Sequence, residues 1–106
     1  MNSAKTVLFF PRAVRDLDEL APKQRNQVLA DITLLQSSQW PVAKIKPLRG
    51  VGLWEVKTGD YRSLFIIDET TCVIARVVNR RDLDRVLGKI DPAFVFGWLK
   101  RQEKAG

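Results

Sequence analysis

The chain has 106 residues, of which 45% are hydrophobic and 28% are charged, a balance typical of one globular domain rather than of a disordered or membrane protein. Eighteen Lys and Arg residues against twelve Asp and Glu residues give a formal net charge of +6, which favours a polyanionic or acidic partner. The chain contains no histidine and one cysteine, which excludes imidazole acid–base catalysis, a zinc site and an internal disulfide.

We therefore expect no metal and no other cofactor. The longest apolar runs are far shorter than the roughly 20 residues of a membrane-spanning helix, and Val7 to Phe10 is shorter than the core of a secretory signal. These features predict a cytoplasmic protein with no membrane contact, folded as a single domain over residues 1–106. Cys72 has Ile74 and Val78 at alternating positions, which favours a buried structural thiol.

The first third of the chain predicts one strand and two helices. Residues 5–10 are typical of a β-strand, and Pro11 ends the strand and suits the first turn of a helix. Apolar residues spaced by three between 14 and 20 predict a short amphipathic helix. Pro22 opens a second helix, whose apolar stripe reaches about Ser38. The two helices together predict a helical hairpin.

The middle of the chain predicts a loop followed by a β-meander. Two prolines and two glycines in residues 41–52 indicate an irregular basic loop. From Leu53 the apolar pattern changes to a period of two, and residues 53–58, 61–68 and 71–78 predict three antiparallel strands joined by tight turns.

The last part of the chain is predicted to be helical. Residues 83–87 indicate a short helix, and Asp91 and Pro92 supply the N-cap and first-turn proline of a final helix. Its apolar face, from Phe94 to Leu99, either packs on the domain's own sheet or is covered by a partner. The main elements follow in the order β-α-α-β-β-β-α, so the predicted fold class is α+β, an antiparallel sheet packed on a helical hairpin.

Five pieces of the sequence, in this order, resemble toxins of the RelE/ParE superfamily. They are Lys46-Pro47-Leu48-Arg49-Gly50, Leu53-Trp54-Glu55-Val56-Lys57, Gly59-Asp60-Tyr61-Arg62, the strand Ile74-Ala75-Arg76-Val77-Val78, and its basic exit Asn79-Arg80-Arg81-Asp82. The resemblance runs from the first strand to about Leu87. It implies a RelE/ParE-like fold and the toxin role of a type II toxin–antitoxin system.

The resemblance leaves the target open, because a fold does not settle a function. RelE-like toxins cut messenger RNA in the ribosomal A site, whereas ParE-like toxins inhibit DNA gyrase and are not nucleases. RelE-like cleavage uses the ribose 2′-oxygen as nucleophile, with Lys and Arg stabilising phosphate charge, and needs no histidine. We expect a metal-independent, ribosome-dependent mRNA endoribonuclease. A gyrase inhibitor is the alternative, and an inactive antitoxin-bound regulator is a third hypothesis.

Carried over position by position, the resemblance implies two sets of site residues. The catalytic set is Lys46, Lys57, Arg62 and Arg81. The RNA-binding set is Lys44, Arg49, Arg80 and Arg85. Each of these cations has a structural alternative, such as an ion pair of Arg62 with Asp60 or Glu55. The chain also departs from RelE, because Leu87 stands where RelE has a tyrosine and cannot transfer a proton.

The nuclease interpretation predicts that Lys46, Arg49, Lys57, Arg62 and Arg81 converge on one concave basic face of the sheet. Trp40 and Trp54 are predicted to pack inside the protein rather than to stack on bases. The resemblance implies an acidic cognate antitoxin as a partner, beside the ribosome and mRNA or, in the alternative, DNA gyrase. It also allows a homodimer or a heterotetramer with the antitoxin.

Overall fold

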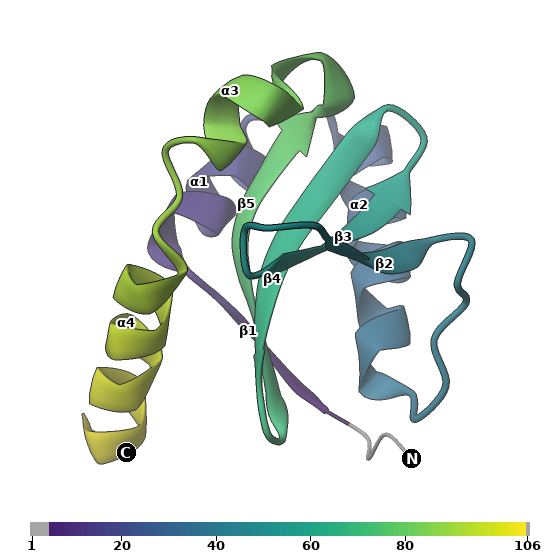
Figure 1. The fold of residues 1–106 in the computed structure, drawn as a ribbon. Helices are drawn as coiled ribbons and strands as arrows, with labels where there is room; N and C mark the ends of the chain where they lie inside the picture. Colours follow the sequence, from purple (N-terminus) through teal and green to yellow (C-terminus); the bar gives the residue numbers. More distant parts are fainter. Residues whose placement is uncertain (1–4, 106) are drawn as a thin grey trace.

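A computed structural model describes residues 5–105, so residues 1–4 and 106 of the predicted domain lie outside the described residues. The described chain forms the strands β1 (Thr6–Phe9), β2 (Ile45–Leu48), β3 (Leu53–Thr58), β4 (Tyr61–Asp68) and β5 (Thr71–Asn79). Its helices are α1 (Pro11–Asp18), α2 (Pro22–Ile32), α3 (Leu83–Leu87) and α4 (Pro92–Ala105), with 3₁₀ turns η1 (Thr33–Gln36) and η2 (Arg80–Asp82). The α+β class is confirmed (Figure 1).

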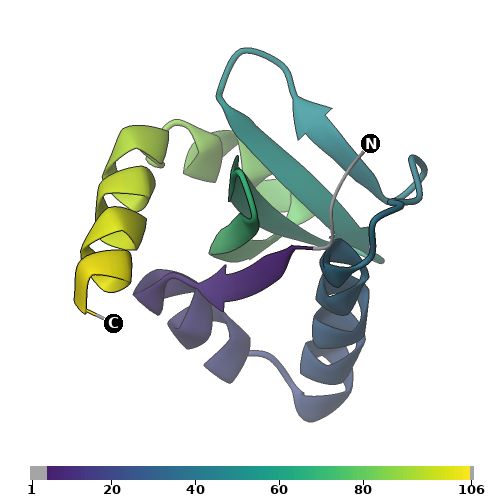
Figure 2. The ribbon, with the colours of Figure 1, turned by 90° about the horizontal axis from the view of Figure 1, so that it is seen from below.

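The described strands form one mixed sheet in the order β1-β5-β4-β3-β2. The predicted meander β3-β4-β5 is confirmed as antiparallel. Helices α1 and α2 cover one face of the sheet, and α3 and α4 cover the other (Figures 1 and 2). We call these the hairpin face and the C-terminal face. No helix among residues 5–105 combines the length and the apolar character needed to cross a bilayer.

Two features of the sheet differ from the sequence-based expectation. Residues 41–52 were predicted to be irregular, but Ile45 to Leu48 pair with β3 as an edge strand, with Pro47 opposite Trp54. An edge strand tolerates a proline because one side of its backbone needs no partner. The first strand pairs parallel to β5, with Thr6 opposite Thr71, so the sheet is mixed rather than wholly antiparallel.

The helices follow the prediction with one change. The second helix ends at Ile32 instead of continuing to Ser38, because the chain tightens into η1. In α4, Val95 and Leu99 are buried against Ile66 of the sheet, so packing on the domain's own sheet is confirmed for these residues. Phe94 keeps 60% of its surface exposed.

Three aromatic rings pack together on the hairpin face. The ring of Trp40 meets those of Trp54 and Phe65 edge-on, with centroid distances of 5.6 and 5.8 Å. Both tryptophans are therefore packing residues, as predicted. Cys72 is fully buried in the same cluster, and burial raises the pKa of its thiol to about 11. The predicted structural thiol is confirmed.

Candidate functional site

Three of the predicted catalytic cations share the C-terminal face. Lys57 lies directly opposite Arg62 in the β3–β4 ladder, and Lys46 lies opposite Glu55 in the β2–β3 ladder. Glu55 and Lys57 are two residues apart on one strand, so their side chains project to the same side of the sheet. The sheet therefore brings Lys46, Lys57 and Arg62 together.

Glu55 is a buried carboxylate between two of these cations. Its side chain is only 3% exposed, and its oxygens lie 3.9 Å from Nζ of Lys46 and 3.8 Å from Nε of Arg62. The ion pair with Glu55, which the sequence offered as the structural alternative for Arg62, is present, whereas Asp60 pairs with Arg80 at 3.4 Å. A buried charge is tolerated when it is paired, so Glu55 holds Arg62 in place.

Arg62 is further fixed by the backbone. Its Nη1 donates to the carbonyl oxygens of Gly59 and Tyr61, both at 2.9 Å, and its side chain is 12% exposed. A guanidinium with this many contacts loses little conformational freedom when it binds an anion, which is what electrostatic stabilisation of a transition state requires.

Arg81 lies elsewhere. It belongs to η2, where its backbone N–H donates to the side-chain oxygen of Asn79 at 3.1 Å. Its side chain lines a groove of about 300 Å³ between α1 and α3, which we call the Arg81 groove. Arg12, Arg76 and Arg85 also line this groove, but Lys46, Lys57 and Arg62 do not. Of the five cations predicted to converge, the structure thus places three on one face and Arg81 in a separate groove.

Lys44 points to the hairpin face. Its Nζ lies 2.9 Å from Oδ2 of Asp31 on α2, and Thr58 donates its hydroxyl to the same oxygen at 2.8 Å. Lys44 therefore connects the loop before β2 to α2, and its amino group lies away from Lys57.

The other predicted RNA-binding cations are on the surface. Arg49 is exposed in the turn between β2 and β3. The side chain of Arg80 is 66% exposed beside Asp60, and Arg85 lies 3.3 Å from Asp82. Exposed pairs of this kind are weak, about 0–1 kcal/mol, so they leave both arginines available to a partner.

Sequence reasoning gave Arg76 no role in a site, because the sequence did not reveal a β-bulge in β5. Leu64 pairs with Arg76, but the next residue, Phe65, pairs with Ile74, so Ala75 is an extra residue in β5. The bulge places Ala75 and Arg76 on the same side of the strand, and both line a pocket beside α4. A regular strand would have directed one of them to the hairpin face.

Asp16 on α1 anchors this arginine. Its carboxylate accepts hydrogen bonds from Arg76 at 2.7 and 3.2 Å and from the backbone N–H of Val77 at 2.9 Å. Nε of Arg12 lies 3.4 Å from the same carboxylate. Since β1 pairs with β5 only as far as Ile74, Asp16 also satisfies a backbone donor on the uncovered edge of β5.

Leu87, which the sequence resemblance aligns with a tyrosine of RelE, is half-buried and packs against both apolar clusters of the C-terminal face. It is a packing residue of α3. Within residues 5–105, no three His, Cys, Asp or Glu side chains gather in a way that could hold a metal ion.

Comparison with known proteins decides the family. No family model and no curated protein matches the chain. Among solved structures, it is similar to a chain of the toxin–antitoxin complex RelBE2 from Mycobacterium tuberculosis, with 35% identity over 74% of this chain and 93% of that chain, and a TM-score of 0.59. The chain belongs to the RelE family of toxins.

More distant structures show the same fold. A mutant of the E. coli toxin RelE in the free state is 23% identical, over 72% of this chain and 83% of its own, with a TM-score of 0.57. The E. coli DinJ–YafQ toxin–antitoxin complex matches at 18% identity, over 76% and 97%, with a TM-score of 0.60. Nothing in these comparisons favours the gyrase-inhibitor alternative for this RelE-family toxin.

Proposed function

We propose that this RelE-family toxin is a ribosome-dependent endoribonuclease that cuts messenger RNA and stops translation. The observation that carries the proposal is the pairing of Lys57 and Arg62 across the β3–β4 ladder, with Lys46 on the same face. Three cations on one face form a site for the phosphate of a bound RNA strand. The membership of the RelE family supports the same assignment.

In the proposed reaction, the ribose 2′-oxygen attacks the adjacent phosphorus and the bond from phosphorus to the 5′-oxygen breaks, which leaves a 2′,3′-cyclic phosphate. The proton of the 2′-hydroxyl passes to water, and water protonates the leaving 5′-oxygen. Arg62, held by Glu55 and two carbonyls, stabilises the charge that develops on the phosphate oxygens, and Lys57 and Lys46 assist it. The ribosome supplies the orientation of the two reacting atoms. Because Leu87 offers no proton donor, the toxin contributes charge stabilisation and binding rather than proton transfer through a tyrosine.

Arg81 is proposed to bind the RNA strand beyond the cleaved bond, since its groove lies at the end of β5. Arg49, Arg80 and Arg85 are exposed and are proposed to add contacts with phosphate groups of mRNA or ribosomal RNA. Lys44 contributes less in this proposal, because its amino group points to Asp31 on the hairpin face, away from Lys57 and Arg62.

The partner is proposed to be an acidic cognate antitoxin that holds the toxin inactive. Its support is the net charge of +6, together with the toxin–antitoxin complexes of RelBE2 and DinJ–YafQ to which the chain is similar. Assembly as a homodimer or as a heterotetramer with the antitoxin stays a prediction. A cytoplasmic location follows from this proposal, because ribosomes and mRNA are cytoplasmic.

The test uses purified ribosomes programmed with a defined mRNA, with cleavage positions mapped by primer extension. Lys57→Ala is expected to reduce the cleavage rate by about a hundredfold or more, the usual effect of losing one transition-state contact. Arg81→Ala is expected to weaken the binding of mRNA and so to reduce cleavage at low toxin concentration. Lys23→Ala, an exposed lysine on α2, is the matched control and is expected to cut at the normal rate. Unchanged cleavage by both site variants would refute the site, and arrest of replication before translation in cells would favour gyrase as target.

A further inference from the structure

An acidic side chain, Glu55, lies among the cations of the proposed cleavage site. Its oxygens are 3.9 Å from Nζ of Lys46 and 3.8 Å from Nε of Arg62, and the side chain is 3% exposed. Taking a carboxylate out of water costs free energy even when the carboxylate is paired. A carboxylate beside a phosphate-binding cation also repels the phosphate. Glu55 therefore opposes RNA binding at the position where RNA is proposed to bind.

The contacts of Glu55 leave N–H donors of Arg62 available. Its distance from Nε of Arg62 exceeds the roughly 3.2 Å of an ordinary N–H···O hydrogen bond, so the attraction between the two groups is one of charge. The hydrogen bonds from Arg62 to the carbonyl oxygens of Gly59 and Tyr61 both use Nη1. The donors on Nε and Nη2 can therefore still bind a phosphate in a bidentate manner.

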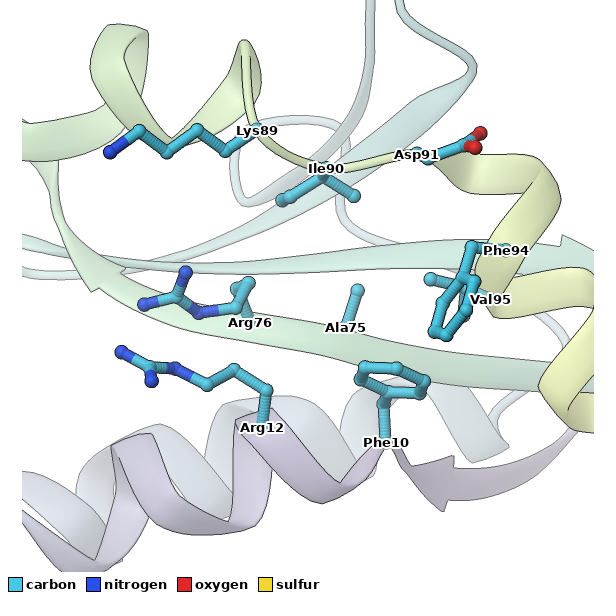
Figure 3. Close-up of a pocket in the computed structure, with 9 residues that line it drawn as sticks. All are labelled: Phe10, Arg12, Ala75, Arg76, Lys89, Ile90, Asp91, Phe94 and Val95. Atoms are coloured by element: carbon cyan, nitrogen blue, oxygen red, sulfur yellow. The ribbon is translucent and has the colours of Figure 1, made fainter.

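A structural ion pair in the same protein has a different geometry. Asp16 accepts two hydrogen bonds from Arg76, at 2.7 and 3.2 Å, and one from the backbone N–H of Val77 at 2.9 Å. Figure 3 shows Arg12 extending beside Arg76, and Nε of Arg12 lies 3.4 Å from the same carboxylate. Asp16 thus bonds directly to its arginine and connects α1 to β5.

Glu55 makes no comparable connection between separate elements. It lies on β3, and its partners Lys46 and Arg62 lie on β2 and β4, which the backbone ladders already join to β3. The side chain of Lys46 is 50% exposed, whereas that of Arg62 is 12% exposed. The charge of Glu55 therefore acts chiefly on the orientation of Arg62.

We propose that Glu55 is a positioning residue of the cleavage site, whose charge fixes the guanidinium of Arg62 for the transition state and at the same time lowers the affinity of the site for RNA. This inference rests on the proposed function, in which Arg62 stabilises the charge that develops on the phosphate oxygens. An interaction that favours the transition state over the bound substrate raises the turnover number, whereas tighter binding of both does not. Glu55 raises turnover by the first route.

The lowered affinity distinguishes RNA on the ribosome from free RNA. Free single-stranded RNA is attracted by the cations of the protein alone, and the net charge of +6 would otherwise favour its capture. The ribosome already holds mRNA in place, so the toxin needs to supply less binding energy there. The carboxylate of Glu55 therefore limits the binding of free RNA and contributes to the dependence of cleavage on the ribosome.

The experiment separates turnover from affinity in full-length variants. Glu55→Gln removes the charge and keeps the shape of the side chain, and Glu55→Asp keeps the charge but withdraws it from Arg62. The matched control, Glu103→Gln, removes the same charge at an exposed position on α4. Ribosomes programmed with mRNA give kcat and KM, fluorescence anisotropy with a labelled oligouridine gives the dissociation constant for free RNA, and circular dichroism checks the fold.

Glu55→Gln is expected to lower kcat by about tenfold or more without raising KM, and to bind the oligouridine about fivefold more tightly than the wild type. Glu55→Asp should also lower kcat, but its affinity for the oligouridine should stay within about twofold of the wild type, because the charge is kept. Glu103→Gln should stay within about twofold in every measurement, because water screens its charge. In an Arg62→Ala background, Glu55→Gln should not lower kcat further, because Glu55 acts through Arg62.

A normal kcat in both folded Glu55 variants would overturn the proposal, and so would a raised KM with an unchanged kcat. If Glu55→Gln does not fold, Glu55→Asp decides, and a normal kcat in that variant overturns the positioning role. An equal gain in RNA affinity in Glu103→Gln would overturn the local effect of Glu55 on binding. A wild-type protein that cuts no mRNA on ribosomes would refute the proposed nuclease, and the oligouridine comparison would still test the effect of Glu55 on affinity.

Discussion

Ser63 carries a buried hydroxyl group that has no hydrogen-bond partner among the described residues. It lies in the centre of β4, with Val56 and Val77 as its neighbours across the two ladders, and its exposed fraction is 0%. Burying an unpaired polar group costs about 1–3 kcal/mol. The sheet therefore contains a polar atom that opposes folding.

We expect Ser63→Ala to raise the free energy of unfolding by about 1 kcal/mol, because the substitution removes the unpaired hydroxyl and little volume. Urea denaturation measures the change as a higher midpoint at an unchanged slope. Thr58→Ala is the matched comparison: its hydroxyl donates to Asp31 at 2.8 Å, so its loss should lower stability by about 1 kcal/mol. A lower midpoint for Ser63→Ala would contradict the expectation.

The buried thiol of Cys72 is expected to make the protein less stable at alkaline pH. Burial raises the pKa of its thiol from 9.0 to about 11, so the unfolded chain ionises first as the pH rises. Its contribution to stability is complete below pH 9 and declines as the pH passes from 9 towards 11, by up to about 3 kcal/mol. Comparing wild type with Cys72→Ala across this range isolates the thiol from the lysines. An identical pH dependence in both proteins would show that the thiol does not contribute.

At the residue scale, the sequence identified the cations but not their partners. Lys44 and Lys46 are two residues apart and were both predicted to serve the RNA site, yet Lys44 bonds to Asp31 on α2 and Lys46 lies near Glu55 on the other face. The partners come from α2 and β3, and no local pattern reveals such tertiary pairs. Arg76 was missed for the same reason, because its direction depends on an irregular register between two strands.

At the element scale, the long periodic segments were predictable and the short edge strand was not. Strands β3, β4 and β5 alternate or are continuously apolar, and their turns are marked by glycine or polar residues. Strand β2 has four residues, including Pro47, and its pattern is too short to outweigh the loop signal. The parallel direction of β1 depends on the crossover through α1 and α2, which the sequence pattern does not specify.

Helix α4 contains a residue whose truncation should strongly destabilise the protein. Leu99 is 1% exposed and packs with Leu53, Ile66 and Val73, so it anchors the helix on the sheet together with Val95. Leu99→Ala should lower the free energy of unfolding by about 3 kcal/mol, from lost burial and the cavity left behind. Gln102→Ala on the exposed side of α4 should change it by less than about 0.5 kcal/mol. Thermal and urea denaturation measure both, and equal stabilities would show that α4 is not docked in solution.

At the scale of the whole molecule, charge and apolar surface are distributed for two different partners. The face with Lys46, Lys57 and Arg62 offers three neighbouring cations and suits a phosphate backbone. The pocket between the starts of α1 and α4 instead joins cations to the exposed ring of Phe94 and suits a peptide. The net charge of +6 attracts both an acidic protein and RNA, so the local chemistry of each surface, rather than the overall field, distinguishes them.

That overall field predicts the salt dependence of antitoxin capture. Opposite net charges raise the encounter rate, and the Debye length shortens from about 10 Å at 0.1 M salt to about 3 Å at 1 M. We expect the association rate constant to fall by about tenfold or more between about 0.05 and 0.5 M salt. The dissociation rate constant should change much less, because it depends on short-range contacts within the formed complex. Stopped-flow mixing of the separated proteins measures both constants. Lys23→Glu reduces the net charge by two at an exposed position on α2, so it should lower the association rate at low salt and leave dissociation unchanged. An association rate that does not respond to salt would exclude electrostatic capture of the antitoxin.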